Sequence, residues 1–418
     1  MITEEMRNNV NIIKYKVDNF DIMFKDGSIE KMNGDMVTHL YIEKDYDDLY
    51  FPIINISIVM KDKVYQKIQN EIDTVKFRLR VIKNIYDKKN TFLKYELCFN
   101  EVFQCFKDKD SIVKDNDAEK SKEDAEGEDN VTLGTNTRNF YLFTDDVTKC
   151  KKTYNLSISS GNMTDLLVYI MGDTGINKLL MSKLNNNPSV SGINVPSGNT
   201  IETITYLDNL KSFYEKGMLL FFDIDTTYII DMNYQCTAWR KNEIKITHIH
   251  VSNQQTVDSQ LNGYFINKDR KQTHVFANTD RVQTKNMNIL GNQLSGNNIK
   301  IIDSKTGNVT SVAASTTTVG SSNDHLVSIK SGNKYAITEL QTRLEENECI
   351  CGVTLIGVDL DVVSPNKEVV VTYEDSKLNK EYGGNYRVCR SITTLTKDAG
   401  ELIGEVQVEL RKQKIDIG

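Results

Sequence analysis

The chain has 418 residues, of which 39% are hydrophobic and 26% are charged, and its formal net charge is −7. This length suffices for more than one hydrophobic core, while no apolar run reaches the roughly 18–20 residues of a membrane-spanning helix, so we expect no membrane insertion. The negative balance, without a basic stripe interleaved with aromatic residues, argues against specific nucleic-acid binding, which needs clustered Lys and Arg.

The beginning of the chain is predicted to be rich in strands. Its first hundred residues alternate apolar and polar side chains with a period of two, and Asp26–Gly27 is typical of a hairpin turn. One amphipathic helix is expected within residues 61–73. Strands resume near Asn139. Residues 1–160 are therefore predicted to form an N-terminal β-barrel.

A charged segment interrupts this first barrel. Fifteen of the 24 residues between 107 and 130 are charged, five as Lys and ten as Asp or Glu. Such a segment buries too little apolar surface to offset the entropy of ordering it. We interpret it as an exposed, mobile loop, with an acidic interaction segment as the alternative.

Residues 161–255 are predicted to form a middle region of helix, helix and strand. A capped helix is expected within residues 162–184 and a second within residues 200–217, where Gly217 would end it. The apolar run that follows indicates a strand, a turn and a second strand, with the turn near Asp231–Asn233.

The last part of the chain again favours strands. Residues 256–332 are rich in Asn, Ser, Thr and Gly and are predicted to form a small β-rich insertion. Residues 333–418, with a hairpin turn at Asp398–Gly400, are predicted to form the C-terminal half of a second β-barrel. The predicted fold class is mainly β (α+β), with two β-barrel domains joined by a helical and β middle region.

One stretch suggests catalysis, FFDIDTTYII at residues 221–230, in which Asp223 and Asp225 follow an apolar strand. Phosphatases of the haloacid-dehalogenase type present a nucleophilic and an acid/base aspartate to Mg²⁺ in this way. Their motif leads into a helix whose N-terminus helps to hold the phosphate, whereas here a further strand follows, without the alternating strands and helices of that scaffold. We therefore expect both aspartates on one face of a strand, exposed or bonded to nearby backbone, and predict no catalytic residue.

His248 and His250 are the candidate metal ligands. They lie two residues apart in the sequence THIH, so a strand would place both imidazoles on one face, and a homotrimer would supply six of them at its axis. Without an evident Cys, Asp or Glu partner, such a pair more often marks a solvated strand face. We predict neither a metal nor a cofactor, and we expect the isolated His274 at the surface.

The order of elements resembles the baseplate hub proteins of contractile-tailed bacteriophages and of related phage-tail-like bacteriocins. The resemblance rests on MTDLLVYIMGDTGI, on ETITYLDNLKSFYEKG leading into MLLFFDIDTTYII, and on NYRVCRSITTLTKDAGELIGEVQVEL near the end. In that family one helix leads to a second, which feeds a strand reading Phe-Phe-Asp-x-Asp-x-x-Tyr. The resemblance thus implies that the Asp-x-Asp strand belongs to the architecture.

The same resemblance implies a homotrimer in which each subunit supplies two tube-type β-barrels, so that six barrels match a six-fold tail tube to a three-fold spike. The implied partners are further copies of the chain, the tube protein or tube initiator, the central spike, the tape-measure protein and the baseplate wedge proteins. The implied location is the tail baseplate of a virion or of a tailocin particle. Seven cysteines without a CxxC pair fit synthesis in the bacterial cytoplasm.

The resulting hypothesis is a structural hub that joins the tail tube to the spike and nucleates baseplate assembly, and not an enzyme. The competing hypothesis is a receptor-binding or other tail-tip adhesin protein that contacts the cell surface. That class predicts aromatic clusters on exposed loops, and residues 255–332 contain few aromatic residues, namely Tyr264, Phe265 and Phe276.

Overall fold

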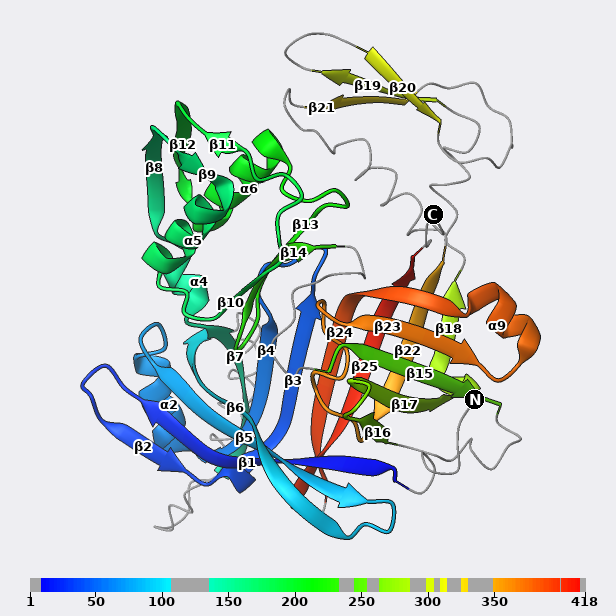
Figure 1. Cartoon of the computed structure of the whole chain (residues 1–418). Coiled ribbons are helices and arrows are strands. Elements are labelled where there is room, and N and C mark those ends of the chain that lie inside the picture. The colour runs from blue at the N-terminus through cyan, green and yellow to red at the C-terminus, as the bar shows by residue number, and fades with distance from the viewer. Residues whose placement is uncertain are drawn as a thin grey trace, which may run out of the picture.

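The computed structural model describes residues 9–106, 135–232, 244–253, 263–285, 298–303, 309–313, 325–329, 349–398 and 400–413. Strands make up most of these residues, and the helices are short (Figure 1). The prediction of a mainly β fold is therefore confirmed. Segment 107–130, predicted as an exposed loop, lies outside the described residues. The division of the chain into four segments stays a prediction.

The centre of the molecule is a closed ring of strands. Eight of the described strands, followed from each to its hydrogen-bonded neighbour, return to their start in the order β24, β3, β4, β7, β6, β5, β1 and β25, because β25 also pairs with β24. Their bounds are β1 Asn11–Met23, β3 Val37–Asp45, β4 Ile53–Lys61, β5 Lys76–Asp87, β6 Phe92–Phe106, β7 Thr135–Thr144, β24 Gly384–Asp398 and β25 Glu401–Lys412. The two ends of the chain thus complete one ring together.

Alternating side chains fill this ring. In β4 every second residue from Ile54 to Met60 is buried, because successive side chains of a strand point to opposite faces. Inside the ring, Phe20 meets Phe77 edge to face with the ring centroids 5.4 Å apart, and Phe77 meets Phe140 at 5.2 Å. Such aromatic contacts add to the stabilisation that burial of the rings provides.

The hairpin of β24 and β25 belongs to two parts of the sheet at once. Its distal half pairs with β3 through residues 390–396 and with β1 through residues 402–403. Its other half pairs with β23 through residues 384–386 and with β22 through residues 405–411. The bounds of these two strands are β22 Ile350–Ile356 and β23 Glu368–Tyr373. In Figure 1 the hairpin stands between the blue strands of the ring and the remaining strands on the right.

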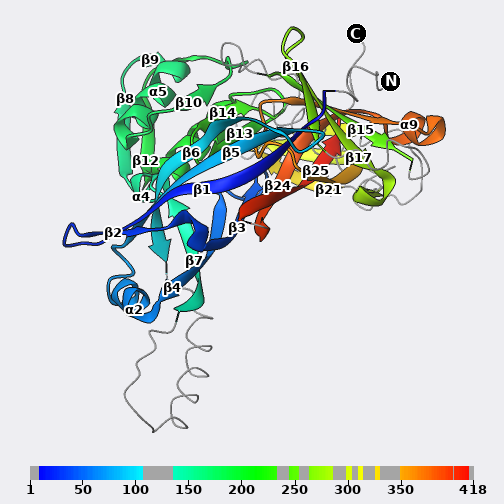
Figure 2. The same ribbon diagram turned by 90° about the horizontal axis from the view of Figure 1, so that it is seen from below.

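Beyond the hairpin the sheet continues through β15 and β17, which run parallel to β23, while β18 extends β22. Strand β16 folds back along β17 and reaches β1, where Tyr264 lies opposite Asn11. Eleven described strands thus form a closed outer circuit, in the order β16, β17, β15, β23, β24, β3, β4, β7, β6, β5 and β1 (Figure 2). Strand β25 lies across this circuit, because it pairs with both β24 and β1. The bounds are β15 Ile246–Ser252, β16 Tyr264–Asn267, β17 Gln272–Asn278 and β18 Val282–Lys285.

A smaller lobe with its own hydrophobic core packs against the ring. Its elements are α4 Asp146–Lys149, β8 Thr153–Ile158, β9 Gly161–Asn162, α5 Met163–Thr174, β10 Leu179–Met181, β11 Ser189–Val190, β12 Ile193–Asn199, α6 Thr200–Lys211, β13 Met218–Phe222 and β14 Thr227–Asp231. Both predicted helices are present, and α6 begins with a capping box formed by Asn199 and Glu202. The predicted end of this helix at Gly217 is wrong. It ends at Lys211, because Ser212 turns to a φ of 49° and the Asp208 side chain accepts the next N–H.

The remaining elements connect or flank these parts. The predicted amphipathic helix is α2, and the predicted hairpin turn at Asp26–Gly27 joins β1 to β2. Their bounds, with those of the other elements, are β2 Ile29–Met32, η1 Gly34–Met36, α2 Asp62–Asn70, η3 Thr279–Arg281, β19 Asn298–Asp303, β20 Val309–Ala313, β21 His325–Ile329 and α9 Ser376–Tyr382. Within the described part of the chain, no helix is long and apolar enough to cross a bilayer.

Where β25 lies beside β1, there is no room for a side chain at Gly404. A Cβ there would lie 2.8 Å from Cε2 of Tyr15, a fully buried side chain whose hydroxyl donates to the carbonyl of Val358 at 2.8 Å. Gly404→Ala is expected to lower the free energy of unfolding by about 1–3 kcal/mol. Gly352→Ala in β22 is the control, because its Cβ would meet nothing closer than 3.7 Å. Equal urea midpoints for the two variants would contradict the claim that Gly404 lies too close to Tyr15 for a side chain.

Candidate functional site

Asp223 follows a strand whose two faces are both buried. Phe221 of β13 belongs to the core of the ring, whereas Phe222 belongs to the core of the smaller lobe. Because both faces are covered, the apolar run has no alternation that could reveal where the strand ends. Phe222 pairs with Thr227, so the turn spans residues 223–226. The sequence did not predict this turn. Strand β14 ends at Asp231, where the turn expected near Asp231–Asn233 would begin, and residues 233–243 lie outside the described ranges.

The carboxylate of Asp223 forms a buried ion pair with Lys44 of β3. The Lys44 Nζ lies 2.9 Å from Oδ1 and 3.0 Å from Oδ2, and Asp223 is only 4% exposed. Its Oδ1 also accepts the N–H of Ile224 at 2.7 Å. A third charge, the 61% exposed side chain of Asp361, lies 3.6 Å from the Lys44 Nζ. The ion pair thus ties the turn of the smaller lobe to the wall of the ring.

The prediction that Asp223 and Asp225 share one face of a strand is therefore wrong, whereas the predicted bond to nearby backbone is present at Asp223. Both lie in the turn, and Asp225 alone is exposed. Asp223 is drawn inward because β3 places an ammonium beside it, and a buried charge is tolerated when it is paired and hydrogen-bonded. The carboxylate contacts the ammonium through both oxygens, which is the arrangement of a hydrogen-bonded counter-ion.

Burial acts against the charge of both partners. It lowers the pKa of Lys44, but the attraction of Asp223 and Asp361 outweighs burial, so that the pKa lies well above its ordinary value. Burial raises the pKa of Asp223, and the neighbouring Lys44 counteracts this only in part. Lys44 therefore carries its charge at neutral pH, and the pair holds because each partner compensates the other.

Removal of one partner should leave the other charge uncompensated. Asp223→Ala is expected to lower the free energy of unfolding by about 3 kcal/mol, since only the exposed Asp361 then remains near Lys44. The matched control is Asp225→Ala in the same turn, which should change stability by less than about 0.5 kcal/mol. Chemical denaturation of both variants checks this, and a stable Asp223→Ala protein would show that the ion pair does not hold the lobe.

Three histidines stack on the neighbouring strands β15 and β17. His248 lies opposite His274 in the parallel register, and the ring of His274 is 4.8 Å from that of His248 and 5.2 Å from that of His250. The Nε2 of His250 lies 3.0 Å from the Nδ1 of His274. His250 is 8% and His274 is 6% exposed. The expectation of a surface position for His274 is wrong, because the pairing of β15 with β17 places it beside His248 and His250, where its side chain is buried.

The stack does not have the geometry of a metal centre. Its rings are nearly parallel, with interplanar angles of 10° and 13° to His274, whereas ligands of a tetrahedral zinc converge on one point. In the described residues no group of three or more His, Cys, Asp or Glu side chains is arranged to hold a metal ion. That His248 and His250 bind no metal stays a prediction.

The buried stack makes stability depend on pH. Burial, together with the charge of the neighbouring histidines, lowers the pKa of His250 to about 3, and burial lowers that of His274 to about 4. The unfolded chain binds protons on both residues below about pH 6.5, where the folded protein keeps them neutral, so the free energy of unfolding should fall as the pH drops from about 7.5 to 5.5.

The double variant His250→Gln/His274→Gln should show a flatter dependence of the urea midpoint on pH over this range. An unchanged slope in the double variant would show that protonation of the stack does not limit stability in this range.

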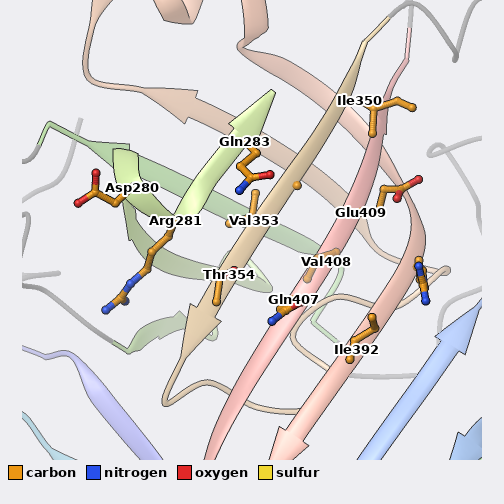
Figure 3. A pocket seen from close by; sticks show the side chains of 12 residues that line it. Asp280, Arg281, Gln283, Ile350, Val353, Thr354, Ile392, Gln407, Val408 and Glu409 are labelled. Carbon is orange, nitrogen blue, oxygen red and sulfur yellow. The ribbon is translucent and has the colours of Figure 1, made fainter. Parts of the chain in front are cut away.

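A pocket of about 390 Å³ opens on the face of the sheet formed by β18, β22, β25 and β24 (Figure 3). Asp280, Arg281, Arg390 and Glu409 line it together with amide and apolar side chains. The guanidinium of Arg390 also contacts the carboxylate of Glu43. Opposite charges are therefore mixed along its wall, which also includes the hydroxyl of Thr354.

Solved structures that match the chain are tail proteins and a component of a secretion system. A tail protein from Neisseria meningitidis MC58 is 11% identical with a TM-score of 0.52, over 96% of this chain and 97% of that chain. The 43 kDa tail protein of prophage MuSo2 from Shewanella oneidensis is 11% identical with a TM-score of 0.47, over 93% and 97%. An E. coli component of the type VI secretion system, described as similar to T4 bacteriophage tail proteins, is 8% identical with a TM-score of 0.43, over 91% and 77%.

The match to the Neisseria tail protein, which covers 96% of this chain, shows a common fold, as the resemblance seen in the sequence implied. No curated protein matches the sequence significantly. The sequence model of a protein family described as Bacteriophage PBS1 gene 109 protein matches residues 6–413. The chain therefore belongs to the Bacteriophage PBS1 gene 109 protein family.

Proposed function

We propose that the chain is the hub of a phage tail baseplate, a structural protein that joins the tail tube to the central spike and nucleates baseplate assembly. The observation that carries this proposal is the fold match that covers 97% of the length of a known tail protein. Membership in a family described by a bacteriophage gene supports the same location. The particle is a virion, or a tailocin built from the same parts.

The proposed assembly is a homotrimer. Each subunit has a ring of strands and, across the β24–β25 hairpin, a second curved part of the same sheet. Three copies would present six curved β units, which suits contact with a six-fold tube on one side and a three-fold spike on the other. The further partners in this proposal are the tape-measure protein and the baseplate wedge proteins.

The proposal gives the chain no catalytic role. Asp223, the one residue that suggested a nucleophile, has both carboxylate oxygens within 3.0 Å of the Lys44 Nζ. The ion pair anchors the smaller lobe, and in this proposal the lobe positions parts of the baseplate relative to the tube.

Electron microscopy of particles from a producer that lacks the gene tests the proposal. We expect no complete tails, with only loose sheath-like polymers, because tube and sheath would have no baseplate on which to start. A plasmid copy of the gene should restore complete tails. If complete tails form without the protein and only adsorption to cells is lost, the hub proposal fails and the receptor-binding alternative takes its place.

A further inference from the structure

Strand β6 has one edge that no described strand covers over most of its length. It pairs with β5 from Phe92 to Gln104, but on its other side it pairs with β7 only through residues 103–106. Near Glu101 the smaller lobe approaches this side through Lys178, 3.7 Å away. Residues 92–97, here called the β6 edge, therefore project beyond the ring with unpaired backbone groups on one side, among the residues that the structure describes. Exposed edges of this kind are templates for pairing with another chain.

The β6 edge is also apolar. Four of its six side chains are large, hydrophobic and more than half exposed, namely Phe92 at 52%, Leu93 at 52%, Tyr95 at 66% and Leu97 at 54%. Single exposed apolar residues are common on protein surfaces, whereas a contiguous group marks an interaction site. This group lies on a strand whose alternation would otherwise place polar residues toward water.

The charges of the β6 edge compensate one another. The ammonium of Lys94 contacts the carboxylate of Glu96, and the Nζ of Lys83 on β5 lies 3.6 Å from the same carboxylate. Monomeric proteins commonly block an edge with an uncompensated Lys or an inward-pointing charge. Neither charge of the β6 edge is uncompensated, so a partner strand would meet a nearly neutral surface.

The same chain already contains a contact of this kind. The hairpin β24–β25 reaches out of one part of the sheet and adds its strands to β3 and β1 of the ring. The hairpin β5–β6 is built alike, since it too consists of a strand of 12 and a strand of 15 residues and follows a short helix. At the distal end of the β5–β6 hairpin, however, only β5 has a partner outside the hairpin, namely β1.

We propose that the β6 edge binds a second copy of this chain. The β6 edge pairs with an edge strand of that copy and so extends its sheet. Tyr95 and Leu97 are buried in the contact. Strand β18, which pairs only with β22 among the described strands, offers a second uncovered edge, as a head-to-tail contact between identical copies requires. Repeated around an axis, such contacts close a ring. This inference rests on the proposed trimer and names the surface that holds it together.

Sedimentation of the purified full-length chain over a range of concentrations tests the inference. The wild type is expected to associate. Tyr95→Lys and Leu97→Lys should each raise the dissociation constant at least about tenfold, because a charge would enter the centre of an apolar interface. The matched controls lie on α5, where Tyr169 is 56% and Val168 is 51% exposed, and Tyr169→Lys and Val168→Lys should leave the dissociation constant within about twofold.

Hydrogen exchange gives a second readout. The amides of residues 92–97 should exchange more slowly in the associated wild type than in Tyr95→Lys, while the buried strands of the ring exchange alike in both, which shows that the variant is folded. Equal association of Tyr95→Lys and the wild type would overturn the inference and leave the hub proposal intact. A wild type that stays monomeric at every concentration would overturn it too. The hub proposal itself stands or falls with the deletion experiment.

Discussion

The backbone pairing of one hairpin, β24–β25, holds the whole sheet together. Without its distal half, β3 and residues 14–15 of β1 would lose their partner and the ring would be open. Without its other half, β22 would keep only β18 and β23 only β15 as partners among the described strands. The two curved parts of the sheet therefore cannot separate unless hydrogen bonds of this hairpin break. A single stiff body of this kind suits a joint between two parts of a tail.

The buried ion pair has the same consequence for the smaller lobe. The lobe has its own core, and the hairpin β13–β14 contributes side chains to both cores. Lys44 reaches from the ring to Asp223 at the turn of that hairpin, so the ion pair connects the turn to the ring. The motif that looks catalytic in the sequence forms a buried ion pair between the lobe and the ring. It shows why an Asp-x-Asp pattern predicts chemistry only when its scaffold is also present.

Local patterns predicted the elements that depend on local physics. Alternation indicated the strands, and a cap residue indicated α5, whereas Gly217, the cap expected for α6, lies beyond the end of that helix at Lys211. The turn at 223–226 could not be predicted, because burial on both faces removes the alternation that ends at a turn. The ring closure by residues 390–403 and the burial of His274 depend on pairing between distant parts of the chain, which leaves no local trace in the sequence.

Electron cryomicroscopy of intact particles, with the density at the end of the tail tube reconstructed, tests the central claim most directly. The account predicts three copies of this fold between the tube and the spike, each with its two curved β units beside those of its neighbours. A particle in which the chain occupies another position, such as peripheral fibres, or in which that junction is built from other proteins, would contradict the account.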